Sequence, residues 1–170
     1  MRFTNLPGWR NGGVAQAVTS NWSLATILQF STGYPFTISV FGDTANAGTL
    51  LGENPVRANV TGASLFPAGT RTASLWFNPA AFATPAAYTF GNAGRNTVEG
   101  PPMQLVDFAL AREFRLLESV HLQFRAEFFN SLNHTNLGTP NRFVNTPQFA
   151  TVTMAMHPGR EIQLGGRVTF

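Results

Sequence analysis

Polar and ionisable side chains occupy almost every second position in residues 113–115, 121–127 and 161–167, and these residues are the best equipped for chemistry. They include carboxylates, guanidinium groups, an imidazole and amides, which serve in acid–base catalysis, metal binding or the lining of a polar ligand path. A spacing of two residues places such side chains on one face of a β-strand. We call this set the polar ladder; it consists of Glu113, Arg115, His121, Gln123, Arg125, Glu127, Glu161, Gln163 and Arg167.

Neither catalysis nor metal binding is indicated by these residues. Glu113 and Glu127 are both carboxylates, but nothing marks one as an acid and the other as a base. His121, His134 and His157 do not stand at metal-ligand spacing from one another or from a carboxylate. The sequence also has no Cys, no nucleophile-elbow motif and no phosphate-cradling loop. We therefore predict no catalytic residue, no cofactor, no metal site and no enzyme activity.

The polar ladder has two possible roles on such a face. Its charges alternate in sign, so it could line a substrate path. The same alternation also allows salt bridges and hydrogen bonds among the polar side chains that line the lumen of a barrel. We favour the structural, lumen-facing role.

Four strands must position the ladder, and strict two-residue alternation predicts them at residues 20–32, 104–116, 120–130 and 160–170. In the third of these, apolar residues at even positions oppose polar residues at odd positions. This is the pattern of a transmembrane strand with lipid on one face and a polar lumen on the other. Arg112 interrupts the apolar face of the second strand. We expect it near the periplasmic rim, where a long side chain reaches the headgroups.

The short connection Leu117-Glu118-Ser119 fixes the register between the second and third strands. Both apolar faces use even residue numbers, so the turn must have an odd length to keep the two faces aligned. A three-residue turn meets this requirement. It predicts that Phe114 pairs with Leu122 and Arg115 with His121.

The long connections 41–103 and 131–159 alternate with that short turn, as extracellular loops alternate with periplasmic turns in outer-membrane barrels. Only 11% of the residues are charged, against about 25% in ordinary soluble domains, and 16 are Phe. The Arg residues are scattered, which argues against nucleic-acid binding. The predicted fold class is all-β, with antiparallel transmembrane β-barrel strands. We expect the loop aromatics to pack the loops together rather than bind a ligand; they are Trp76, Phe77, Phe82, Tyr88 and Phe90.

The last predicted strand carries a pattern of polar, Gly, apolar and aromatic residues at Gln163, Gly165, Val168 and Phe170. It resembles the β-signal that the outer-membrane assembly machinery reads on its barrel substrates. We predict that these four residues form an assembly signal. The alternative is an ordinary edge strand.

Other segments resemble the Oar-like TonB-dependent outer-membrane receptors that are abundant in acidobacteria. The resemblance extends from about Leu6 to Phe170. The segments that carry it are Trp76-Phe77-Asn78-Pro79-Ala80-Ala81-Phe82, Phe90-Gly91-Asn92-Ala93-Gly94-Arg95-Asn96, Gly100-Pro101-Pro102, Asp107-Phe108-Ala109-Leu110-Ala111-Arg112-Glu113-Phe114 and Phe124-Arg125-Ala126-Glu127-Phe128-Phe129-Asn130-Ser131-Leu132-Asn133-His134.

This resemblance implies a barrel of about 22 strands, filled by an N-terminal plug, in the bacterial outer membrane. Residues 1–170 would be the C-terminal part of that barrel domain, because residues 1–7 lack an export signal and no plug or regulatory domain is recognisable. The implied partners are outer-membrane lipid, the barrel-assembly machinery, and TonB through the N-terminal part of the parent receptor. The competing hypothesis is a soluble or surface β-sandwich module for adhesion or carbohydrate binding. Such a sandwich would bury Phe124, Phe128, Val168 and Phe170, whereas a barrel would expose them.

Overall fold

The computed structural model describes residues 2–3, 20–48 and 56–170, which divide into two compact units. The first, here called the strand unit, comprises residues 1–29, 104–134 and 158–170. The second, the loop unit, comprises residues 30–103 and 135–157. Most of the N-terminal segment 1–7, and the start of the resemblance near Leu6, lie outside the described residues. No helix in the described ranges is long and apolar enough to span a membrane.

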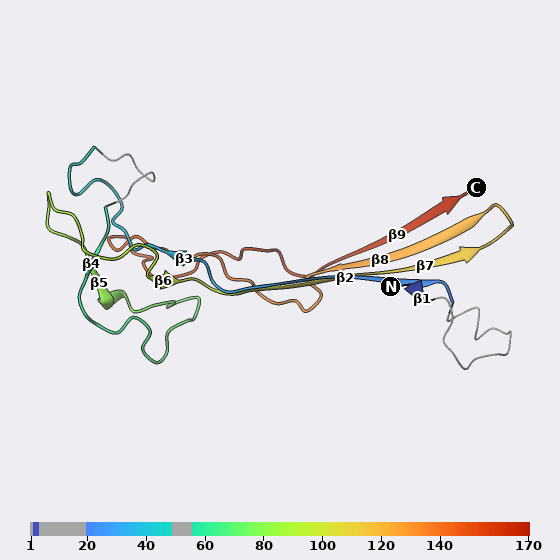
Figure 1. The fold of residues 1–170 in the computed structure, drawn as a ribbon, viewed down its shortest axis with the longest axis horizontal. Coiled ribbons are helices and arrows are strands. Elements are labelled where there is room, and N and C mark those ends of the chain that lie inside the picture. The colour runs from blue at the N-terminus through green and yellow to red at the C-terminus, as the bar shows by residue number, and fades with distance from the viewer. Residues whose placement is uncertain (1, 4–19, 49–55) are drawn as a thin grey trace. The chain divides into compact units, whose positions relative to one another are not determined.

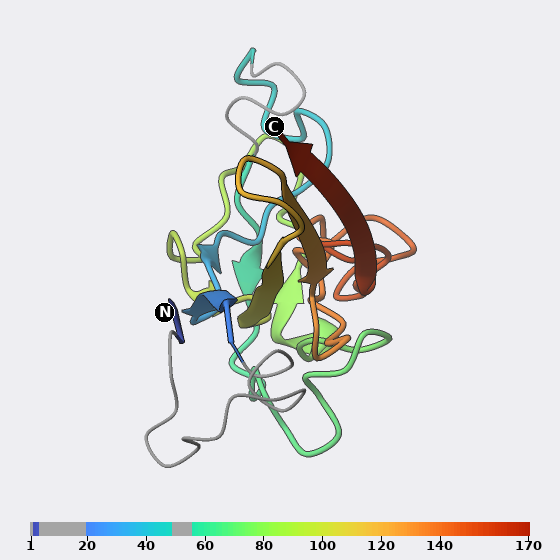
Figure 2. The same ribbon diagram turned by 90° about the vertical axis from the view of Figure 1, so that its right-hand side faces the viewer.

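The strand unit is built on a five-stranded sheet, with the order β1-β2-β7-β8-β9 (Figure 1). The pairs β1–β2, β7–β8 and β8–β9 are antiparallel, and the structure confirms the predicted all-β, antiparallel fold class. Seen along the strands, β9 is curved and lies at the outer edge beside β8 (Figure 2). The strands are β1 (Arg2–Phe3), β2 (Trp22–Ser31), β7 (Met103–Arg115), β8 (His121–Phe129) and β9 (Glu161–Thr169).

The register between β7 and β8 is the one that the turn length predicted. Phe114 lies opposite Leu122, and Arg115 lies opposite His121. The turn is closed by hydrogen bonds between Leu117 and Val120, in which the Leu117 N–H donates to the Val120 carbonyl at 3.2 Å. Because β9 continues the same even-with-even pairing, the apolar positions of all three strands share one face.

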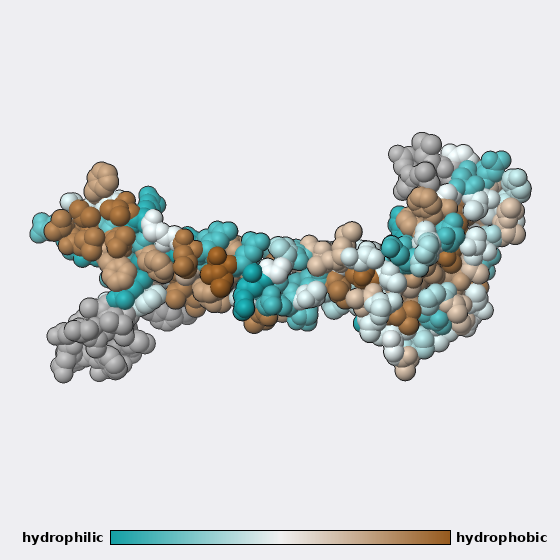
Figure 3. Space-filling model, turned by 180° about the vertical axis from the view of Figure 1, so that it is seen from behind, coloured by the Kyte–Doolittle hydropathy of each residue, from teal (hydrophilic) through white to brown (hydrophobic). Residues whose placement is uncertain are grey.

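The apolar face of the strand unit is not covered by a second layer of the described chain. Every residue of β9 is exposed, and Leu164 and Val168 expose 68% and 56% of their surface. Figure 3 shows hydrophobic surface at the end of this unit that carries the turn. Phe124 and Phe170 are exposed at 45% and 95%, whereas Phe128 is half-buried, with its ring stacked on that of Phe108 at 4.4 Å. The two-sheet core required by the β-sandwich hypothesis is absent from the described residues, so that alternative is not favoured.

The loop unit, in contrast, has a hydrophobic core of its own, which the sequence pattern did not reveal. Its short elements are β3 (Pro35–Phe36), β4 (Asn59–Val60), the 3-10 helix η1 (Pro79–Ala81), β5 (Phe82–Ala83) and β6 (Val98–Glu99). Antiparallel pairs join β3 to β6 and β4 to β5. The buried core residues are Phe36, Ile38, Ala58, Trp76, Phe77, Ala81, Phe82, Ala93, Val98, Ala150 and Val152.

Three of the five loop aromatics pack as predicted. The Phe77 ring makes edge contacts with Phe82 and Phe149 at 6.0 and 5.1 Å between centroids, and the Trp76 indole N–H donates to the Glu99 carbonyl at 2.8 Å. The prediction is wrong for Tyr88 and Phe90, which are 77% and 71% exposed. The packing is tight at Gly33, where a Cβ atom would lie 1.8 Å from the Gly100 carbonyl oxygen.

Candidate functional site

The polar face of the strand unit collects the ladder residues that the sequence singled out. Across β7, β8 and β9, Glu113, Gln123 and Arg167 form one row, and Arg115 and His121 lie in the next row toward the turn. In the rows farther from the turn, Arg125 and Glu127 in β8 lie opposite Gly165 and Gln163 in β9. The register therefore brings the whole polar ladder to one face: Glu113, Arg115, His121, Gln123, Arg125, Glu127, Glu161, Gln163 and Arg167.

Two ion pairs connect members of the ladder. His121 Nδ1 lies 3.1 Å from Glu113 Oε1, diagonally across the β7–β8 pair, and Arg125 Nη2 lies 2.7 Å from Glu127 Oε1 along β8. The side chains of Arg125 and Glu127 are 54% and 30% exposed. Solvent screening limits such exposed pairs to about 1 kcal/mol or less. Both pairs therefore contribute little to stability, and the His121–Glu113 contact is an ion pair only when His121 is protonated.

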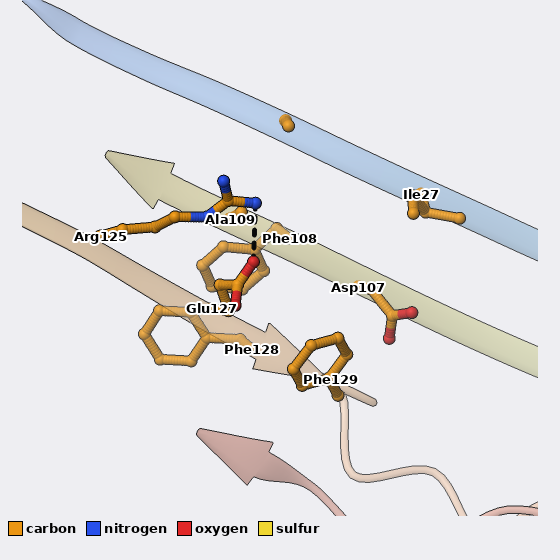
Figure 4. Close-up of a pocket in the computed structure, with 9 residues that line it drawn as sticks. Ile27, Asp107, Phe108, Ala109, Arg125, Glu127, Phe128 and Phe129 are labelled. Carbon is orange, nitrogen blue, oxygen red and sulfur yellow. Dashed lines mark ion pairs between the residues drawn. The ribbon is translucent and has the colours of Figure 1, made fainter. Parts of the chain in front are cut away.

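Arg125 and Glu127 also border a small hollow in this face, with a volume of about 110 Å³ (Figure 4). Its other walls come from β2, β7 and the end of β8, and they include Ile27, Asp107 and Phe129. A neighbouring hollow of about 240 Å³ shares Arg125 and is floored by small residues of β2 and β7. The hollows arise because Ala occupies most of the polar-face positions beside Arg125.

Asp107 belongs to a second polar cluster, centred on Asn130, which the sequence analysis did not identify. The Asn130 side-chain amide donates to the carbonyls of His134 and Pro158 at 3.0 and 3.1 Å, and its Oδ1 accepts from the His134 N–H at 3.0 Å. Asn130 is 4% exposed and has φ 47°, a conformation that Asn tolerates better than most residues. The cluster ties the end of β8 to the segment leading into β9.

A second asparagine completes this connection. Asn133 has φ 51°, and its Oδ1 accepts a hydrogen bond from the Arg160 N–H at 3.1 Å. In the sequence, these residues belong to the run Asn130-Ser131-Leu132-Asn133-His134, one of the segments that resemble Oar-like receptors. The structure shows that it is a backbone clamp.

The remaining His residues occupy structural positions. His134 contributes backbone groups to the Asn130 cluster, and His157 Nε2 lies 3.2 Å from Met103 Sδ within the loop unit. In the described parts of the chain, no three His, Asp or Glu side chains gather as a metal site would require.

The predicted assembly-signal residues lie on or just beyond β9, the edge strand of the described sheet. Gln163 and Gly165 face the ladder side, and Val168 lies opposite Leu122 on the apolar side. Phe170 follows the strand and is 95% exposed.

Arg112 lies in a row of the apolar face that is separated from the turn by further apolar residues. It pairs with Phe124 in β8, and Phe124 pairs with Gly166 in β9. Two more rows of apolar residues lie between this row and the turn at residues 117–119. Its guanidinium carbon lies 5.2 and 4.4 Å from the ring centroids of Trp22 and Phe114. Arg112 therefore interrupts the apolar face, as the sequence indicated, and its position near the periplasmic rim stays a prediction.

Comparison with known proteins provides one match. The family model of an outer membrane beta barrel domain matches residues 3–163. No curated protein and no solved structure matches the chain.

Proposed function

The chain belongs to the outer membrane β-barrel domain family, and we propose that it forms part of the barrel wall of an Oar-like TonB-dependent receptor. Membership of the family places the protein in the bacterial outer membrane. Within the proposed receptor, the chain is a structural wall of a substrate-uptake channel. We assign it no catalytic step.

One observation supports the wall function above all others. The register of β7, β8 and β9 gives the sheet an exposed apolar face and, on the opposite side, a face of ladder residues. Lipid-facing and lumen-facing residues alternate in this way in transmembrane β-barrels. The five described strands are too few to close a barrel, which takes at least about eight strands. We therefore expect the remaining wall to come from other strands of a longer protein.

The receptor type is supported by the family-like sequence segments rather than by the fold. Receptors of this type are driven by TonB, and we place that contact in the N-terminal part of the parent receptor. The polar ladder then borders the lumen and forms a charge-satisfying network, as the pairs His121–Glu113 and Arg125–Glu127 suggest. Insertion of the wall would require the barrel-assembly machinery, with β9 carrying its signal.

Cysteine labelling of the full-length parent protein in intact outer membranes tests the wall function. These 170 residues contain no Cys, so single substitutions from Leu122→Cys to Glu127→Cys introduce isolated labels here. A water-soluble maleimide should label the odd positions several-fold faster than the even ones. Equal labelling at both kinds of position would contradict a lipid-facing wall.

A separate measurement tests the receptor type. TonB should cross-link to the parent protein and lose that cross-link when the N-terminal contact segment is deleted, while the cysteine pattern of the barrel persists. If the barrel pattern is found and TonB never cross-links, the protein is an outer-membrane barrel of another kind.

A further inference from the structure

A thioether and an imidazole lie in direct contact in the loop unit, at a place that the proposed wall function does not use. His157 Nε2 is 3.2 Å from Met103 Sδ, and both residues are half-buried. Met156 directly precedes His157 and exposes 44% of its surface. Three of the four Met residues of the chain, Met103, Met154 and Met156, therefore occur at this contact or within three residues of it.

Backbone hydrogen bonds hold the segment just before His157. The Met156 N–H donates to the Asn136 carbonyl at 2.7 Å, and the Gly138 N–H donates to the Met154 carbonyl at 2.9 Å. A Cβ atom at Gly138 would lie 3.1 Å from Met154 Cγ, so the Met154 side chain covers the neighbouring segment. Met156 is the thioether next to His157 in the chain. Its unbranched side chain has three rotatable bonds with which to turn the sulfur toward the imidazole.

Two thioethers and an imidazole are ligands that suit a soft monovalent cation. Thioether sulfur is a soft, neutral ligand that selects Cu(I), and imidazole nitrogen binds copper as well. Residues 135–157 contain no Asp or Glu, whose carboxylate oxygens would favour a hard cation such as Mg²⁺ or Ca²⁺. Since the three side chains are neutral, none of them offsets the charge of the ion. A single positive charge therefore costs less to hold at this half-buried place than two would.

The distance between His157 Nε2 and Met103 Sδ is compatible with one shared ion. With bonds of about 2.0 Å to nitrogen and about 2.3 Å to sulfur, the separation of 3.2 Å corresponds to an angle of about 95° at the metal. A separation of about 3.5 Å would give the tetrahedral angle, so only a small side-chain movement is needed. Either angle is far from linear and leaves one side of the ion open for a third ligand.

We propose that Met103, Met156 and His157 form a binding site for Cu(I). The two sulfur atoms and His157 Nε2 each donate a lone pair to the ion, and the imidazole carries its proton on Nδ1. The ion binds and leaves as Cu(I), so the site performs no redox step. The proposal departs from the sequence-based prediction of no metal site, which considered His spacing, Cys and carboxylates but not Met.

The same contact has a structural explanation, in which a protonated Nε2 donates a weak hydrogen bond to the Met103 sulfur. The second thioether directly before His157 favours the metal, because a hydrogen bond needs only one sulfur. Met103 and residues 135–157 all belong to the loop unit. The proposal therefore does not depend on the lumen-facing wall or on TonB, and its failure would leave both of them unaffected.

Calorimetric titration of the full-length parent protein with Ag(I), in mild detergent, tests the proposal. Ag(I) is the probe because it shares the charge and the soft ligand preference of Cu(I) and is stable in air. His157→Gln should weaken binding at one site by at least about tenfold, and so should Met103→Leu and Met156→Leu, because losing even an outer-shell partner costs about that much. Gln keeps an N–H that can donate to the Met103 sulfur but offers no imidazole lone pair. A parallel titration with Cu(I), kept reduced by ascorbate, should rank the variants in the same order.

Met154→Leu is the matched control, since it makes the same substitution at a Met that is 69% exposed and covers Gly138. This variant should bind Ag(I) as the wild type does. Resistance of residues 56–103 to an added protease shows that the loop unit is folded in each variant. If Met103→Leu loses that resistance, His157→Gln and Met156→Leu decide the test.

Three other outcomes overturn the proposal in distinguishable ways. Unchanged Ag(I) binding in folded His157→Gln means that the contact is an N–H···S hydrogen bond that serves the fold. Equal losses in Met154→Leu and Met103→Leu mean that surface thioethers bind the ion one by one, without a built site. Displacement of Ag(I) by an equimolar amount of Zn²⁺ means that the site prefers a borderline cation and contradicts the assignment to Cu(I).

Discussion

The backbone N–H of Asn130, just past β8, donates a hydrogen bond of 2.8 Å to the Asp107 carboxylate on the neighbouring strand β7. The Asn130 side chain makes three further hydrogen bonds, two to His134 and one to Pro158. One residue thus joins β7, β8 and the approach to β9. The backbone at the end of β8 is therefore held by side-chain hydrogen bonds as well as by strand pairing.

Asn130→Ala should destabilise the folded parent barrel by about 2–4 kcal/mol, because buried amide partners lose their hydrogen bonds and Ala is strained at φ 47°. The measurement is the free energy of unfolding in urea with the barrel in lipid vesicles. Asn133→Ala is the matched control, since it has a similar φ and its side chain makes one hydrogen bond. It should cost clearly less. Equal costs would mean that only the backbone conformation matters.

Phe124→Arg should destabilise the barrel by about 2–4 kcal/mol, because it adds a cation to the lipid-facing side near mid-depth. Gln123→Arg, one residue earlier and on the ladder side, should change the stability by less than about 0.5 kcal/mol. The same urea titration measures both. If the two variants are equally destabilised, the assignment of the faces fails.

The pair Arg125–Glu127 should have a coupling energy of no more than about 1 kcal/mol, since both side chains are partly exposed. A double-mutant cycle with Arg125→Ala and Glu127→Ala measures it. We also expect substrate uptake to survive both single substitutions, because we assign the ladder a structural role. Loss of uptake in a stably folded Glu127→Ala barrel would show that the ladder contacts the substrate.

Phe77→Ala should destabilise the loop unit by about 3–5 kcal/mol, because Phe77 is fully buried and its ring contacts those of Phe36, Phe82 and Phe149. Tyr88→Ala should cost less than about 0.5 kcal/mol, since Tyr88 is 77% exposed. The rate at which an added protease cuts residues 56–103 on intact cells reports the difference. Rapid cleavage of the unsubstituted protein in this range would argue against a packed loop core.

Phe170→Asp should reduce the amount of membrane-inserted parent barrel several-fold, because we predict that Phe170 is part of the assembly signal. A charge on the lipid face costs at most about 2–4 kcal/mol at mid-depth and less near the rim, so stability alone predicts a small loss. Outer-membrane fractionation compares this variant with Phe124→Asp, whose defect should be one of stability. Insertion of Phe170→Asp at the unsubstituted level would refute the signal.

The strands and their register were predictable because alternation and turn length are local properties. The pairing of Phe114 with Leu122 follows from even numbering on both sides of a three-residue turn. The loop core was not predictable in this way, because Ile38, Ala58 and Ala150 come from distant segments without a common period. The clamp at Asn130 depends on hydrogen bonds from its side-chain amide to backbone carbonyls, and no periodicity or composition of the sequence predicts such hydrogen bonds. The contacts of Arg112 with the rings of Trp22 and Phe114 became clear only from the structure.

The core of the loop unit limits how the sequence of this unit can diverge. Loops without a core accept substitutions freely, whereas Trp76, Phe77 and Val98 constrain the segments around them as strongly as the interior of a small domain would. Substitutions should therefore be tolerated best at exposed tips such as residues 86–90, where Tyr88 and Phe90 contribute nothing to the buried core.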